Sequence, residues 1–84
     1  MKRSKEEILE DILDICKEPT KKTRIVYQAN LNFKNVDRYL SSLINAAALE
    51  ASETRPITYR TTSRGRELLE RMRAINAQLG RNNK

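Results

Sequence analysis

The chain has 84 residues, 17 basic and 11 acidic, and a net charge of +6, so it is one small domain that buries only about 60–65% of its unfolded surface. Its single cysteine excludes an internal disulfide, and it has no histidine, no phosphate-binding loop and no stretch typical of a signal peptide or a membrane span. We therefore expect a soluble, cytoplasmic, nucleoid-associated protein without catalytic residues, metal, cofactor, membrane contact or small-molecule ligand.

The positive charge is unevenly distributed along the chain. Residues 1–20 carry four basic and six acidic side chains (net −2), residues 21–59 carry six and three (net +3), and residues 60–84 carry seven and two (net +5). This distribution predicts an acidic first helix and a basic face formed by the remaining segments, suited to a polyanion or an acidic protein surface. An ordinary solvated surface is the alternative.

A first helix is expected after Ser4, because Ser4 and Glu7 have the spacing of a capping box, and Pro19 should end the element. Apolar residues then recur along one stripe: Ile8, Leu9, Ile12, Leu13, Ile15 and Cys16. Cys16 continues that stripe and is interpreted as a small buried hydrophobic residue. Acidic residues occupy the other face: Glu6, Glu7, Glu10, Asp11 and Asp14.

A second, short helix is predicted to begin at Thr20 or Thr23 and to end at Ala29. It should bury Ile25, Val26 and Ala29 and leave its polar residues outside: Lys21, Lys22, Arg24 and Gln28.

A third helix is predicted from Phe33 to about Ala47, with Asn32 as its N-cap. Its expected inward face comprises Phe33, Val36, Tyr39, Leu40, Leu43, Ile44 and Ala47, and its outward face Lys34, Asn35, Asp37, Arg38, Ser41, Ser42 and Asn45. Two short helices joined by a tight turn make a helix-turn-helix candidate. Lys34, Asn35 and Arg38 have the chemistry that recognises base edges in a major groove, although a plain solvated face would also be polar.

A β-hairpin is predicted after the third helix, because Leu49, Ala51, Ile57 and Tyr59 alternate with polar residues around the loop "SETRP". Two strands alone are marginal, so the hairpin should lie on the helices. Arg55 in the loop and Arg60 at the strand end would let it reach a DNA backbone. A hairpin that merely covers the core is the alternative.

The last helix should run from about Ser63 to Leu79, with Thr62 as N-cap and Gly80 as its stop. Gly65 in its first turn indicates a close neighbour, either the hairpin, which we favour, or a DNA phosphate. Arg64 and Arg66 are expected to face outward.

A heptad spacing of apolar residues on this helix predicts a dimer seam: Leu68, Met72, Ile75 and Leu79, with Leu69 beside it. A helix of about 17 residues is roughly 25 Å long, so part of it should project, pair with a second copy and bury part of the first helix. The alternative is a monomer in which the helix folds back on its own core. Residues 81–84 are expected to form a disordered basic tail.

Two segments carry a resemblance to a known family: "EILEDILDICKEPTKKTRIVYQANLNFKNVDRYLSSL" and "YRTTSRGRELL". Together they resemble the small archaeal winged helix-turn-helix DNA-binding proteins with a C-terminal dimerisation helix. The resemblance implies DNA binding by a dimer through the third helix and the wing, and an archaeal or archaeal-virus origin. Where the family has a glycine closing the third helix, this chain has Ala47, which predicts a helix one turn longer and a poorly anchored first wing strand.

The sequence thus predicts a mainly α fold with a small β-hairpin, a winged helix-turn-helix domain over residues 1–62 and a dimerisation helix over residues 63–80. The predicted function is a dimeric DNA-binding transcriptional regulator that places the third helix in the major groove of double-stranded DNA. The alternatives are a protein-interaction module for an acidic partner and a sequence-nonspecific architectural protein. The predicted DNA-binding residues are Lys21, Lys22, Arg24, Asn32, Lys34, Asn35, Arg38, Ser42, Arg55, Arg60 and Arg64.

Overall fold

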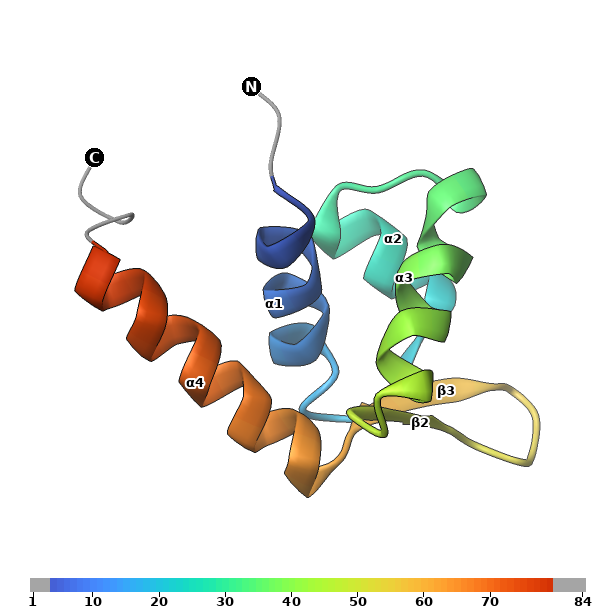
Figure 1. Ribbon diagram of the computed structural model, residues 1–84. Coiled ribbons are helices and arrows are strands. Elements are labelled where there is room, and N and C mark those ends of the chain that lie inside the picture. The colour runs from blue at the N-terminus through green and yellow to red at the C-terminus, as the bar shows by residue number, and fades with distance from the viewer. Residues whose placement is uncertain (1–3, 80–84) are drawn as a thin grey trace.

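The computed structural model describes residues 4–79, in which three helices pack around a small sheet and a long fourth helix runs past the first (Figure 1). The elements in chain order are α1 (Lys5–Ile15), β1 (Thr20–Lys21), α2 (Lys22–Ala29), α3 (Phe33–Asn45), β2 (Leu49–Ala51), β3 (Thr58–Thr61) and α4 (Ser63–Leu79). The predicted fold class, mainly helical with a small β-hairpin, is confirmed.

The start of α1 is the predicted capping box. The Glu7 N–H donates to Oγ of Ser4 and the Ser4 N–H donates to Oε1 of Glu7, both over 3.1 Å. Ile12, Leu13 and Cys16 from its apolar stripe are fully buried at the centre of the core. Burial raises the pKa of the Cys16 thiol to about 12, so the thiolate is disfavoured and the residue is a packed hydrophobic group.

The sheet has three strands, although only the two strands of the hairpin were predicted from the sequence. β1 pairs antiparallel with β3, Thr20 opposite Tyr59 and Lys21 opposite Thr58, and the strand order is β1-β3-β2. The prediction of a two-stranded sheet was therefore wrong. A two-residue strand has no alternation that a sequence pattern could reveal, and it forms because β3 presents a free edge.

The start of α2 also differs from the prediction, because the helix begins at Lys22, between the two candidate threonines. Thr20 is buried, and its hydroxyl lies within hydrogen-bond distance of the carbonyls of Ile15 (3.3 Å) and Glu18 (2.7 Å) instead of capping α2. That hydroxyl therefore stabilises the turn after α1.

The predicted cap of α3 is present: Oδ1 of Asn32 accepts the Asn35 N–H over 3.0 Å. Val36, Leu40 and Leu43 form its buried face. Phe33 and Ile44 were predicted to face inward, but their exposed fractions are 55% and 40%. They share one flank of the helix, about three turns apart, at the margin of the buried face.

The end of α3 corrects a second expectation. The helix was expected to continue through Ala47, but it ends at Asn45, and Ala47 is exposed in the left-handed conformation with φ 61°. The Ala48 N–H donates to the Leu43 carbonyl over 2.8 Å, which closes the helix as a glycine cap would. Ala48 and Leu49 are thereby buried to 0% and 2% exposure, and this burial outweighs the roughly 1–2 kcal/mol that alanine loses there.

The junction of the hairpin and α4 explains Gly65. Its N–H donates to Oγ1 of Thr62 over 3.0 Å, which confirms the predicted N-cap. A Cβ at Gly65 would overlap the Ala48 carbonyl oxygen and lie 2.7 Å from Cγ2 of Thr61. The close neighbour is therefore the hairpin, through Thr61 of β3 and through Ala48, which directly precedes β2. This is the alternative that we favoured from the sequence.

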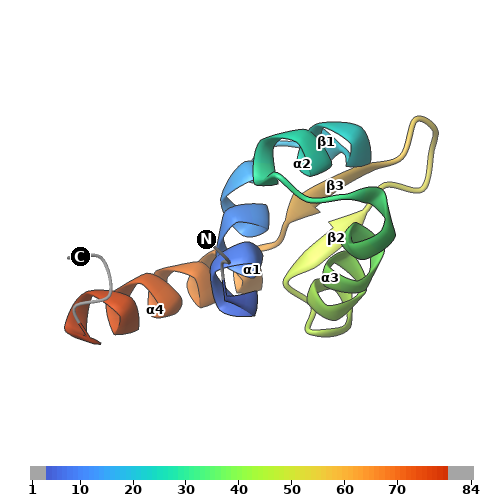
Figure 2. The same ribbon diagram turned by 90° about the horizontal axis from the view of Figure 1, so that it is seen from above.

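The apolar residues of α4 divide between the core and the surface. Leu69 is 2% exposed and Met72 packs against the core, whereas Leu68 and Ile75 are 36% and 54% exposed. Beyond the sheet, α4 passes α1 and extends away from α2 and α3 (Figure 2). The side chain of Leu79, the expected stop at Gly80 and the expected tail lie outside the described part of the chain.

Candidate nucleic-acid interface

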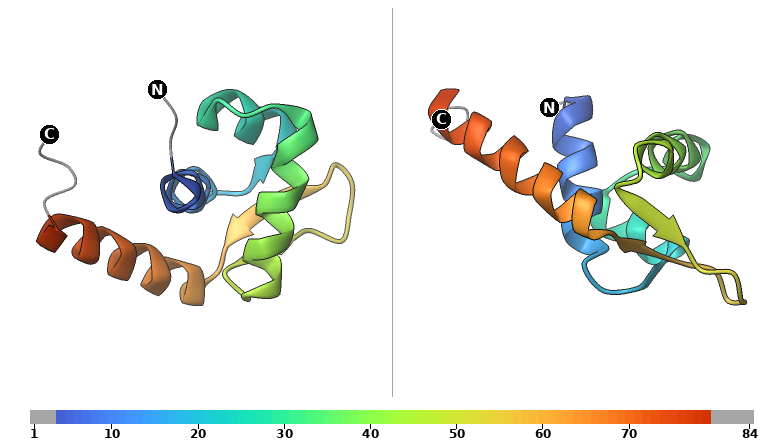
Figure 3. Two further views of the ribbon diagram at one scale, coloured as in Figure 1. Left: turned by 45° about the horizontal axis from the view of Figure 1, so that its top comes forward. Right: turned by 60° about the horizontal axis from the view of Figure 1, so that its bottom comes forward.

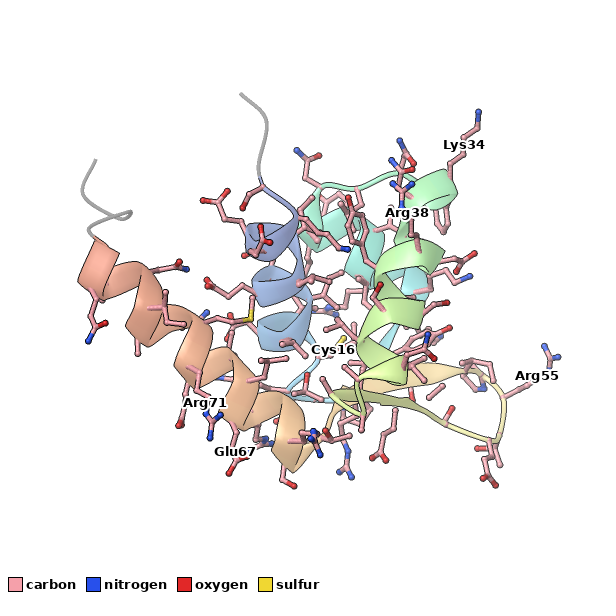
Figure 4. The ribbon with its side chains drawn as sticks, in the orientation of Figure 1. Cys16, Lys34, Arg38, Arg55, Glu67 and Arg71 are labelled. Atoms are coloured by element: carbon pink, nitrogen blue, oxygen red, sulfur yellow. The ribbon has the colours of Figure 1, made fainter. Side chains whose placement is uncertain are left out.

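The outer face of α3 carries the side chains that the sequence analysis assigned to DNA. Lys34 and Arg38 are exposed one turn apart and project on the side of the molecule away from α4 (Figure 4). Nη2 of Arg38 donates to Oδ1 of Asn35 over 3.3 Å, and its guanidinium lies 5.6 Å from the ring centroid of Tyr39. Arg38 is thus oriented before any partner arrives, and Asn35, half-buried, serves as its support.

The β2–β3 hairpin protrudes beyond the helices (Figure 3) and carries Arg55 near its tip. Ser52 braces the loop, because its Oγ accepts the Thr58 N–H over 2.9 Å and donates to the Thr54 carbonyl over 3.0 Å. Arg55 is exposed and points away from the body of the domain, on the same side as Lys34 (Figure 4). The hairpin therefore extends the basic side of α3.

Two of the predicted phosphate contacts are ion-paired within the chain. Nζ of Lys22 lies 2.8 Å from Oδ1 of Asp37, which joins α2 to α3, and this hydrogen bond raises the pKa of Lys22. Nη2 of Arg60 lies 3.1 Å from Oε2 of Glu50, its cross-strand partner in the sheet. Both side chains are partly exposed, so the pairs contribute little stability, but their cations are already partnered.

Six other predicted DNA-binding cations have no carboxylate within 4.0 Å among residues 4–79: Lys21, Arg24, Lys34, Arg38, Arg55 and Arg64. Arg64 stands apart from the α3 face, in an open groove between the C-terminal end of α3 and α4 that is also lined by Ala47, Leu68 and Arg71. The structure thus gathers Lys34, Arg38 and Arg55 on one side and places Arg64 elsewhere.

The two remaining predicted site residues, Asn32 and Ser42, are engaged in or partly covered by the fold itself. Asn32 uses its side-chain oxygen to cap α3, and Ser42 is half-buried. Two exposed aromatic residues, Tyr27 on α2 and Phe33 on α3, were not predicted from the sequence to lie on the surface. Tyr27 lies opposite the buried Ile25, Val26 and Ala29 on the helical wheel, a signal that the pattern of α2 already contained.

Other kinds of site find no support within the described residues. Among residues 4–79 no group of three acidic or cysteine side chains could hold a metal ion. In the same range, no helix combines the length and the apolarity that crossing a bilayer requires.

A long last helix, three shorter helices and a protruding hairpin on a small antiparallel sheet define a winged helix-turn-helix protein. The chain belongs to the winged helix-turn-helix family, whose model matches residues 2–79. It is 35% identical over 68 residues to an uncharacterized protein of Methanocaldococcus jannaschii, covering 80% of this chain and 67% of that protein.

A solved structure resembles the whole described fold. The crystal structure of Sso10a-2, a DNA-binding protein from Sulfolobus solfataricus, matches with a TM-score of 0.85 and 26% identity, over 94% of this chain and 84% of that one. The predicted family is confirmed, and the fold together with this neighbour supports DNA binding.

Proposed function

We propose that the protein is a dimeric DNA-binding transcriptional regulator that inserts α3 in the major groove and lays the β2–β3 hairpin on the phosphate backbone. The observation that carries this proposal is a set of cations on one side of the molecule that have no carboxylate partner among residues 4–79: Lys34, Arg38 and Arg55. A helix-turn-helix protein reads base edges with the N-terminal part of its second helix, and Lys34 and Arg38 occupy that part of α3.

Each cation has a role that its position suits. Arg38, held by Asn35 and Tyr39, can donate both guanidinium branches to O6 and N7 of a guanine. Lys34 projects from the first turn of α3, and Arg55 from the hairpin tip, toward phosphates on either side of the groove. Arg24 and Lys21 add exposed charge at the start of α2.

The dimer is proposed to form through α4. Leu68 and Ile75 are exposed and seven residues apart, so they share one side of the helix, while Leu69 and Met72 are occupied by the core of the same chain. Replacing Leu68 and Ile75 together with glutamate should convert a dimer to a monomer by sedimentation. The variant Ala74→Glu/Ala77→Glu, with equal charge at exposed positions, should stay dimeric, and a monomeric wild-type chain would contradict this part of the proposal.

The experiment that tests DNA binding is a fluorescence-anisotropy titration of a labelled random-sequence duplex at several salt concentrations. Four neutralised phosphates per protomer, one each for Lys21, Arg24, Lys34 and Arg55, would give a slope of about −4 per protomer in log affinity against log salt. Weak binding at low salt that falls steeply with this slope is expected. No binding at low salt would contradict the proposal and favour an acidic protein partner. If several duplexes of different sequence bind with equal affinity, the protein has an architectural role.

A further inference from the structure

Phe33, the chain's single phenylalanine, is exposed where the packing gives no reason for it. Its exposed fraction is 55%, and it is absent from the apolar residues that pack against the core, whereas Tyr39 and Tyr59 are among them. A side chain of this size normally stabilises a small domain by burial. Its ring is therefore available for contact with a partner of the domain.

The surroundings of Phe33 place it at the end of α3 that a recognition helix presents to base edges. Asn32 fixes the first turn through its bond to the Asn35 N–H, so Phe33 is the first helical residue and Lys34 the next. One turn further along the same flank, Asp37 is tied to Lys22 of α2 over 2.8 Å. The phenyl ring thus extends from a capped helix start, next to a cation that has no carboxylate partner within the described range 4–79.

We infer that Phe33 contacts the C5-methyl groups of thymines in the major groove, an inference that rests on the DNA-binding function proposed above. A phenyl ring offers no conventional hydrogen bond, so it cannot read the donor and acceptor pattern of a base. Among the four bases only thymine presents an apolar group in the major groove, and aromatic side chains are one of its partners. Phe33 therefore selects A·T pairs at the edge of the site, next to the contacts of Lys34 and Arg38.

Tyr27 does not compete for this assignment. It is 86% exposed, but it lies on the outer face of α2, the helix that crosses the backbone in this motif. Ile44 offers the matched control, because it is 40% exposed on the same flank of α3, about three turns from Phe33 and at the opposite end.

The test compares two duplexes that differ only in carrying thymine or deoxyuridine, which lacks the methyl group. Removing one methyl group from water is worth about fourfold in affinity, so the wild-type protein should bind the thymine duplex about fourfold more tightly for each methyl contacted. Phe33→Ala should bind both duplexes equally, and Ile44→Ala should retain the preference. Thermal unfolding of both variants verifies that they fold.

The outcomes separate this inference from the proposed function. Equal affinity of the wild-type protein for both duplexes, or a preference that survives in Phe33→Ala, would overturn the role of Phe33 and leave DNA binding in place. A protein that binds neither duplex at low salt would refute the DNA-binding proposal, and the assignment of Phe33 with it.

Discussion

The α1–α4 contact and the α3–hairpin side use the same kinds of charged residue in opposite ways. Where α4 passes α1, Arg73 lies 3.9 Å from Glu10 and 3.6 Å from Asp14, and Nδ2 of Asn76 donates to Glu10 over 2.7 Å. On the other side, Lys34 and Arg55 have no carboxylate partner among residues 4–79. Folding satisfies the first set of charges, and the second set is left for a partner, a distinction that net charge does not reveal.

The largest expected effect separates these two regions directly. Lys34→Glu/Arg38→Glu should weaken duplex binding about 100-fold in anisotropy titrations, because two contacts of about 1–3 kcal/mol each are replaced by repulsion. The control Lys5→Glu/Lys17→Glu makes the same change in net charge on and just after α1. It should weaken binding by less than about threefold, and equal losses in the two variants would show that net charge alone drives binding.

A loss of stability is next expected at Gly65, where the hairpin meets α4 and the two regions are joined. Gly65→Ala places a methyl group against the Ala48 carbonyl and Thr61, and such overpacking costs more than the roughly 1 kcal/mol gained in helix propensity. Urea unfolding should show a net loss of about 2 kcal/mol. Ser63→Ala, exposed in the same turn, should change stability by less than about 0.5 kcal/mol, and a stabilised Gly65→Ala would contradict the packing at this joint.

Features that depend on residues close together in the sequence, such as helix caps and buried helix faces, could be predicted from the sequence. The caps at Ser4, Asn32 and Thr62 follow from side chains that can accept a nearby backbone N–H, and all three are present. The close approach at Gly65 followed from the cost of glycine in a helix. The buried face of α1 followed from its periodicity.

Features that depend on contacts between residues far apart in the sequence could not be predicted from it. The strand β1 exists only because β3 lies beside it, and Ala47 adopts a left-handed conformation only because Ala48 and Leu49 are drawn into the core. Likewise, the cross-strand register pairs Arg60 with Glu50, and the approach of α2 to α3 pairs Lys22 with Asp37. The candidate site could therefore be listed from the sequence but not sorted into paired and unpaired cations.

A smaller effect should come from removing one hydrogen bond of the α1–α4 contact. Asn76 is 8% exposed, and Asn76→Ala removes its bond to the Glu10 carboxylate, at a cost of about 1.5 kcal/mol in urea unfolding. Gln78→Ala, exposed on the same helix, should be neutral. DNA affinity measured well below the unfolding midpoint should stay within about twofold, since α3 and the hairpin are untouched. A large loss of affinity would show that the two regions are coupled.

The core shared by both regions should make stability fall at high pH. Burial raises the Cys16 pKa from 9.0 to about 12 in the folded chain, so between these values the unfolded thiol loses its proton while the folded one keeps it. This contribution is complete below about pH 9 and is lost by about 1.4 kcal/mol per pH unit as the pH rises toward 12. Cys16→Ala should remove this part of the slope in unfolding curves at pH 8 to 11, and an unchanged slope would contradict the buried thiol.

The smallest expected effect is a gain in stability at the end of α3, where Ala47 has a φ of 61°. Ala47→Gly relieves about 1–2 kcal/mol of steric cost but adds freedom to the unfolded chain, so the net gain should be about 0.5–1 kcal/mol, or about 3–6 °C in Tm. Ala46→Gly is the matched control, because Ala46 has a φ of −84° and glycine relieves nothing there, so it should lower Tm. Opposite signs at two neighbouring alanines would show that the α3 side of the domain keeps a strained turn to bury Ala48 and Leu49. A loss of stability at both positions would show that Ala47 is not strained.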